Sequence, residues 1–214
     1  MTELSNYLSS DARELIVMKE FRVSDIDTQV SSRIIKSAVT PRPIGWISTT
    51  SADGVDNLAP FSCYNYISSD YPVVMFSSKV KQGGKPKDTA WNVANTGEFV
   101  VNVVTERLAE QMDQTSAELP ADESEFDFAR LERADSTHVT PPRVADALIS
   151  LECTNIESLD IHDRAVFFGE VETFHIDDEV LVNGKVEMDH LDTVGRLGGP
   201  YYTSVNRMEL TREF

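Results

Sequence analysis

The residues best suited to chemistry lie in the stretch "DGVDNLAPFS", residues 53–62. Asp53 and Gly54 predict a turn, because glycine adopts positive φ without steric cost and aspartate bonds its own backbone. The next segment should return as a pairing strand, yet Pro60 has no N–H to donate to a central ladder. We therefore expect its backbone to lie at a sheet edge or to face something other than a neighbouring strand.

Positive charge gathers on both sides of this stretch in a chain that is otherwise acidic. The chain has 36 acidic and 19 basic residues, for a net charge of −17. Residues 28–52 and 71–87 contain no Asp or Glu, and the second gap holds four of the seven lysines, Lys79, Lys81, Lys85 and Lys87. A local cationic field of this kind suits a small anion such as a phosphate monoester. The alternative is that strands simply contain few acids.

Several common kinds of site are missing from the sequence. It has no G-x-G-x-x-G or G-x-x-x-x-G-K-[ST] loop for a nucleotide and no G-x-S-x-G elbow for a nucleophilic serine. The two cysteines, Cys63 and Cys153, suit single thiols rather than a disulfide scaffold. The four histidines lack metal-ligand spacing and fit surface or loop positions: His138, His162, His175 and His190. Catalytic side chains and a metal are therefore not predicted, which directs attention to a cofactor that carries its own chemistry.

Length and composition predict one folded domain. The chain has 214 residues, 41% of them hydrophobic, and no apolar run approaches the roughly 18 residues that a membrane span needs. The first residues lack the pattern of a secretory signal, so we expect a cytoplasmic protein without a membrane segment. The negative charge argues against nucleic-acid binding. Because the acids are spread along the chain, we favour an acidic, salt-adapted surface over an acidic face for a basic partner.

Short runs rich in β-branched and aromatic residues predict a mainly β protein, a barrel or a sandwich with a few helices. The runs are 44–50, 73–78, 98–104, 147–159, 165–176 and 179–186. Helices are expected after Asp88 or Thr89 as cap with Gly97 as stop, over 106–119, and around 11–21 with Asp11 as cap. Residues 120–144 read as a long excursion with one helical turn. Trp46 and Trp91 are expected in the core.

Four motifs together resemble the flavin reductase-like family of FMN-binding split barrels. They are "TPRPIGWIST" (40–49), "GVDNLAPFSCYNYIS" (54–68), "KDTAWNVANTGEFVVN" (87–102) and "GRLGGPYYT" (195–203). The similarity covers residues 31–214, which leaves 1–30 as an N-terminal extension expected to pack on the domain. The resemblance implies a Greek-key split β-barrel with surrounding helices. It also implies a homodimer with FMN near its interface, held without a Rossmann loop.

The resemblance also implies which residues contact the cofactor. The isoalloxazine ring is assigned to Asn57, Ala59, Pro60, Phe61 and Ser62. Its polar edge could be matched by Asn57 and by backbone amides that the proline leaves unpaired. The phosphate is assigned to Ser48, Thr49, Ser77, Ser78, Lys87, Asp88 and Thr89. Arg196 is assigned to an anionic group, and Tyr201 or Tyr202 to the side of the ring, from this subunit or its partner.

By the same resemblance, the chain is an FMN-dependent oxidoreductase of the flavin reductase type. NADH or NADPH would give hydride to flavin N5, and the electrons would pass to oxygen, free flavin or a protein acceptor. One alternative is a non-enzymatic FMN-binding or electron-carrier protein on the same fold. Another is a partner-binding β-domain whose lysine cluster docks an acidic partner.

Overall fold

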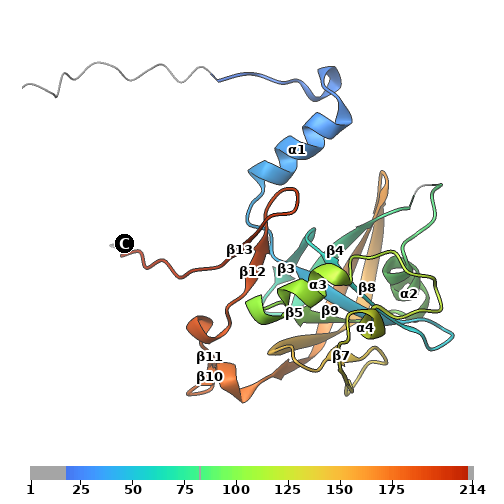
Figure 1. Cartoon of the computed structure of the whole chain (residues 1–214), viewed down its shortest axis with the longest axis vertical. Coiled ribbons are helices and arrows are strands. Elements are labelled where there is room, and N and C mark those ends of the chain that lie inside the picture. Colours follow the sequence, from blue (N-terminus) through green and yellow to red (C-terminus); the bar gives the residue numbers. More distant parts are fainter. Residues whose placement is uncertain (1–17, 82, 212–214) are drawn as a thin grey trace, which may run out of the picture.

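A seven-stranded antiparallel sheet forms the centre of the computed structural model, which describes residues 18–81 and 83–211 (Figure 1). The strands run in the order β2-β1-β5-β8-β9-β4-β3. Their bounds are β1 (Gly45–Thr50), β2 (Asp56–Phe61), β3 (Tyr64–Ser68), β4 (Val73–Lys79), β5 (Glu98–Val103), β8 (Ile149–Ile161) and β9 (Arg164–Ile176). The mainly β prediction is confirmed.

The sheet closes on itself. β2 and β3 stand at its two ends, although only Ser62 and Cys63 separate them in the chain. A link of two residues can join the two edges only if the sheet curls until they meet. Phe61 of β2 and Phe76 of β4 accordingly lie with ring centroids 5.0 Å apart. The result is a barrel in which β2 has β1 as its one strand partner among the described residues.

The core has two main parts, on opposite faces of β1. Inside the barrel, Phe76 packs against Phe99 and Phe167 with centroids 5.3 and 5.2 Å away, and Val93 of α2 (Asp88–Thr96) joins the same cluster. Outside it, Trp46 packs with residues of α3 (Ala109–Gln114) and α4 (Glu125–Phe128). Successive strand residues point to opposite faces, so every residue of β1 is buried.

The remaining elements surround the barrel. Three short ladders pair β6 (Arg133–Ala134) with β7 (Arg143–Val144), β10 (Leu181–Val182) with β11 (Lys185–Val186), and β12 (Val194–Arg196) with β13 (Tyr202–Ser204). Single 3-10 turns are η1 (Val23–Asp25), η2 (Glu106–Leu108), η3 (Asp178–Val180) and η4 (Met188–His190). Helix α1 (Thr28–Ala38) stands outside the barrel beyond the β12–β13 hairpin and buries none of its residues (Figure 1).

Two helix predictions are only partly confirmed. Gly97 ends α2 with φ 74°, as predicted, but the residue that caps its start is Lys87 rather than Asp88 or Thr89, and no side chain bonds there. Leu108 and Met112 are both buried, yet α3 ends at Gln114, well before Pro120. The single turn expected within 120–144 is α4.

The remaining expectations concern the N-terminal helix, the domain boundary and the two tryptophans. The helix predicted around 11–21 falls largely outside the described residues, and residues 18–21 are not helical. Helix α1 was not predicted, and the domain boundary expected at 30/31, which stays a prediction, falls inside it. Trp46 is buried as expected, whereas Trp91 is 59% exposed, so its assignment to the core is wrong.

Within residues 18–81 and 83–211, we find no helix with the length and apolar character needed to cross a membrane. The cytoplasmic location and the salt adaptation stay predictions.

Candidate functional site

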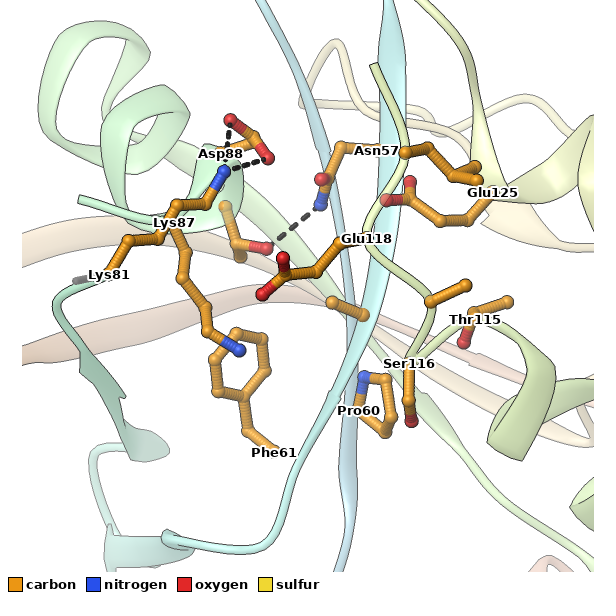
Figure 2. A pocket seen from close by; sticks show the side chains of 14 residues that line it. Asn57, Pro60, Phe61, Lys81, Lys87, Asp88, Thr115, Ser116, Glu118 and Glu125 are labelled. Atoms are coloured by element: carbon orange, nitrogen blue, oxygen red, sulfur yellow. Dashed lines mark hydrogen bonds and ion pairs between the residues drawn. The ribbon is translucent and has the colours of Figure 1, made fainter. Parts of the chain in front are cut away.

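A pocket of about 190 Å³ lies where the edge strand β2 meets the start of α2 (Figure 2). Seven of the fourteen residues predicted to contact the cofactor line it, and they come from two of the four motifs. They are Asn57, Ala59, Pro60 and Phe61 on β2, and Lys87, Asp88 and Thr89 at the start of α2.

Strand β2 reaches this pocket because its outer edge has no neighbouring strand. The N–H of Leu58 points away from β1 and donates to Oε2 of Glu125, 3.0 Å away. Pro60, two residues further on, faces the same side and has no N–H. The edge is therefore left with carbonyl acceptors between 58 and 60. The unpaired strand edge is confirmed, but spare backbone amides, predicted to meet the polar edge of a ring, are absent from this part of β2.

Side-chain amides fix α2 against the barrel. Nδ2 of Asn57 donates to Oγ1 of Thr89 at 2.8 Å, and Nδ2 of Asn92 donates to Oγ1 of Thr49 at 3.0 Å. All four residues are buried. Asn57 and Thr89 therefore hold the strand and the helix together at the pocket wall, and the carbonyl oxygen of Asn57 remains as an acceptor.

The charge around the pocket is mixed rather than cationic. Lys81 pairs with Asp88 at 3.0 Å, and Lys79 pairs with Asp163 at 3.1 Å. Among the described residues, Lys87 forms no ion pair, and it lines the pocket together with the carboxylates of Glu118 and Glu125 (Figure 2). The lysine segment contains no acidic residue, but acidic side chains from other parts of the chain lie beside it in the folded protein.

Glu125 is the most buried carboxylate of the pocket, with 7% of its surface exposed. Burial raises the pKa of its carboxyl group above the ordinary value, while the N–H bond from Leu58 opposes that shift. Figure 2 shows the carboxyl group directed from α4 toward β2.

Five predicted phosphate or ring residues lie outside the lining of this pocket. Ser48 donates to the carbonyl of Pro142 at 2.6 Å, and Thr49 accepts from Asn92 as described above. Ser62 accepts from Arg42 at 3.4 Å, and Ser77 accepts from Arg164 at 3.0 Å. Ser78 is 2% exposed, and its hydroxyl has no hydrogen-bond partner in the part of the chain that the structure describes.

Within one chain, the pocket is also not lined by Arg196, Tyr201 or Tyr202. The guanidinium of Arg196 lies over the ring of Tyr202, 4.3 Å from its centroid, and donates to the carbonyl of Gly199 at 2.6 Å. Tyr202 in turn donates to Asp113 at the end of α3, 2.7 Å away. Tyr201 is 67% exposed. Their assignment to the cofactor stays a prediction.

The sequence interpretation missed the part of the pocket lining that follows α3. That part comprises residues 115–119 and Glu125, and Lys81 of the predicted lysine cluster completes the lining. An adjoining pocket of about 380 Å³ shares Asn57, Asp88, Leu119 and Glu125 with the first and includes the exposed Trp91. Residues 115–124 link α3 to α4, which begins at Glu125, and no local signal distinguishes Glu125 from its acidic neighbours.

None of the four histidines lines the pocket. Across residues 18–81 and 83–211, no group of three or more His, Cys, Asp or Glu side chains could hold an ion. His175 is not a free surface residue, since its ring bonds the buried carboxylate of Glu152.

Comparisons with known proteins agree with the barrel and with the family resemblance. The family model called flavin reductase like domain matches residues 37–191. An uncharacterized protein from Aquifex aeolicus strain VF5 is 39% identical over 184 residues, which are 86% of this chain and 94% of that protein.

Solved structures show the same fold. Nitrilotriacetate monooxygenase component B from Bacillus cereus has a TM-score of 0.86 at 26% identity, over 91% of this chain and 99% of that one. A protein described as a flavin reductase with a split barrel domain, from Shewanella frigidimarina NCIMB 400, has a TM-score of 0.79 at 21% identity, over 92% and 100% of the two chains. The predicted split barrel is confirmed.

Proposed function

The chain belongs to the flavin reductase-like family and is a flavin-dependent oxidoreductase, and from this premise we propose that it binds FMN in the pocket between β2 and α2. We further propose NADH or NADPH as the hydride donor, and oxygen, free flavin or a protein as the final electron acceptor. The observation that carries the proposal is the convergence of Asn57, Ala59, Pro60 and Phe61 with Lys87, Asp88 and Thr89 on one pocket.

The residues present fit a phosphorylated flavin. Lys87 is a cation at the pocket without an ion-pair partner among the described residues. It immediately precedes the first N–H groups of α2, which favour negative charge. These groups support an assignment of the phosphate to this side, although Lys81 and Asp88 offset one another.

The protein's own contribution is to bind, orient and shield. When bound, the flavin supplies the hydride-accepting and electron-transferring chemistry. Ala59 is small enough for a planar ring to approach β2 closely, and Phe61 gives an apolar surface beside it. Drug-sized ligands occupy roughly 300–1,000 Å³, so the 190 Å³ pocket alone is too small for FMN. We therefore propose that the flavin also uses the adjoining pocket, or displaces residues 115–119.

Addition of FMN to the purified protein tests this function. We expect bound flavin with a perturbed visible spectrum, tighter binding of FMN than of riboflavin because of Lys87 and the α2 N-terminus, and bleaching by NADH or NADPH without oxygen. A parallel titration with FAD tests the choice of flavin. Failure to bind any flavin would reject the proposal. Binding without bleaching by either nucleotide would leave a non-enzymatic flavin carrier.

The rival function as a docking domain for an acidic partner has less support. Two of the four clustered lysines, Lys79 and Lys81, are already paired with aspartates. The other two lysines of the cluster, Lys85 and Lys87, have no ion-pair partner among the described residues.

We also propose that the chain forms a homodimer in which α1 contacts a second copy. Val30, Ile34 and Ile35 form one apolar side of α1 and are 41%, 44% and 60% exposed. A helix with such a side is normally packed against another element. Light scattering of the full chain should give twice the mass of one chain. A Val30→Ser, Ile34→Ser double variant should shift the mass to that of one chain, and a monomeric unmodified protein would refute the dimer.

A further inference from the structure

The buried carboxylate of Glu125 has few hydrogen-bond donors within the protein. Its Oε2 accepts the Leu58 N–H at 3.0 Å. Its own backbone N–H is the second donor that lowers its pKa, and no further residue that the structure describes donates a hydrogen bond to it, although it is 7% exposed and lines the pocket. A carboxylate buried in this way needs hydrogen-bond donors, because burial penalises its charge.

The groups beside Glu125 are also acceptors. The outer edge of β2 offers the carbonyls of Leu58 and Pro60, since the Leu58 N–H is occupied and Pro60 has none. Asn57 adds its carbonyl oxygen, while one N–H of its amide donates to Thr89 and the second N–H remains. The carboxylate of Glu125 and the two carbonyls of β2 therefore favour a ligand that presents an N–H donor to them.

On the proposed function, on which this inference rests, that donor is available. The pyrimidine edge of isoalloxazine has one N–H, the imide N3–H, between two carbonyl oxygens. The geometry points to Glu125 as the specificity-determining residue that accepts the imide N3–H of the bound flavin. A charged acceptor makes a stronger hydrogen bond than the neutral carbonyls next to it, so Glu125 provides most of the selection for that N–H.

Binding and stability should respond oppositely to loss of this charge. Burial raises the pKa of Glu125, so the ionised form at neutral pH disfavours the folded state without a ligand. In a Glu125→Gln variant the amide oxygen can still accept from Leu58. The NH₂ group then faces the pocket and opposes a donor on the ligand. A purely structural glutamate would instead lose stability on substitution and leave ligand selection unchanged.

The experiment compares FMN with FMN methylated at N3, titrated into the full-length protein and followed by flavin fluorescence. We expect the unmodified protein to bind FMN about tenfold more tightly, or better, than the methylated form. In Glu125→Gln this ratio should fall close to one, and its Tm at pH 7 without flavin should be equal or higher. Glu132→Gln is the matched control, because Glu132 is exposed outside the pocket and should keep the unmodified ratio.

Each other outcome has a defined meaning. Equal binding of the two flavins by the unmodified protein would refute the imide contact, while the flavin function would stand. An unmodified ratio in Glu125→Gln, with or without a lower Tm, would refute the role of Glu125 and indicate the carbonyls of β2. Absence of binding of both flavins would reject the proposed function and this inference with it.

Discussion

Replacement of Gly169 by alanine is expected to destabilise the protein by about 3 kcal/mol or more, because the new methyl group has no room. A Cβ on Gly169 would lie 2.2 Å from Cζ of Phe99 and 3.1 Å from Cβ of Cys153. Phe99 is fully buried and packs edge-on against Phe76 at the centre of the barrel, so it cannot move aside without disturbing that cluster.

Urea unfolding followed by fluorescence measures this effect. The control is Gly198→Ala, where the nearest atom to a new Cβ is Oγ of Ser37 at 3.8 Å and little change is expected. Phe99→Leu in the Gly169→Ala background should recover part of the loss, since it shortens the side chain in contact. Equal stability of Gly169→Ala and the unmodified protein would show that the barrel interior is looser than described.

The second large effect is expected at Glu152, whose side chain is completely buried. Its carboxylate accepts the N–H groups of Thr137, His138 and Val139 at 2.6, 2.6 and 3.2 Å and also bonds His175. Glu152→Ala leaves these donors unsatisfied and should cost about 3–5 kcal/mol. Glu152→Gln keeps an acceptor and should cost less. Glu172→Gln, an exposed position on the same hairpin, should be close to neutral.

The contribution of Glu152 to the free energy of unfolding should decrease at low pH. Burial alone would raise its pKa, but the N–H bonds from Thr137 and His138 and the contact with His175 outweigh burial and hold the pKa below its ordinary value of 4.5. A depressed pKa stabilises the fold above the unfolded value, and this contribution is lost as pH falls through the folded pKa. The difference in unfolding free energy between the unmodified protein and Glu152→Ala should therefore shrink below about pH 4.5. A constant difference from pH 3 to 7 would contradict this assignment.

The strands could be predicted because their signal is local. Runs such as 44–50 and 165–176 are dense in β-branched and aromatic residues, and they became β1 and β9 nearly residue for residue. Helix α1 was missed because its residues include Thr, Val, Ser and Ile, which are weak helix formers. The available signal was the cap at Asp27, whose side chain accepts the Gln29 N–H, with Val30 and Ile34 four residues apart.

Only the pocket residues that belong to the sequence motifs, on β2 and at the start of α2, could be predicted. The edge position of β2 follows from Pro60, whose missing N–H has a local consequence. The cationic field did not follow from the lysines, because Asp163, which pairs with Lys79, is distant in the chain. Residues 115–119 and Glu125 reach the pocket because the segment after α3 and the helix α4 pack against β2. Composition alone does not show such a contact.

The free edge of β2 has a further consequence, for the behaviour of the protein at high concentration. Exposed strand edges are templates for intermolecular pairing and fibril growth. Here Pro60 removes one donor, and Glu125 occupies the N–H of Leu58. A second molecule therefore finds almost no donors with which to continue the ladder. The features that suit β2 to hold a small molecule thus also protect the protein against polymerising through this strand.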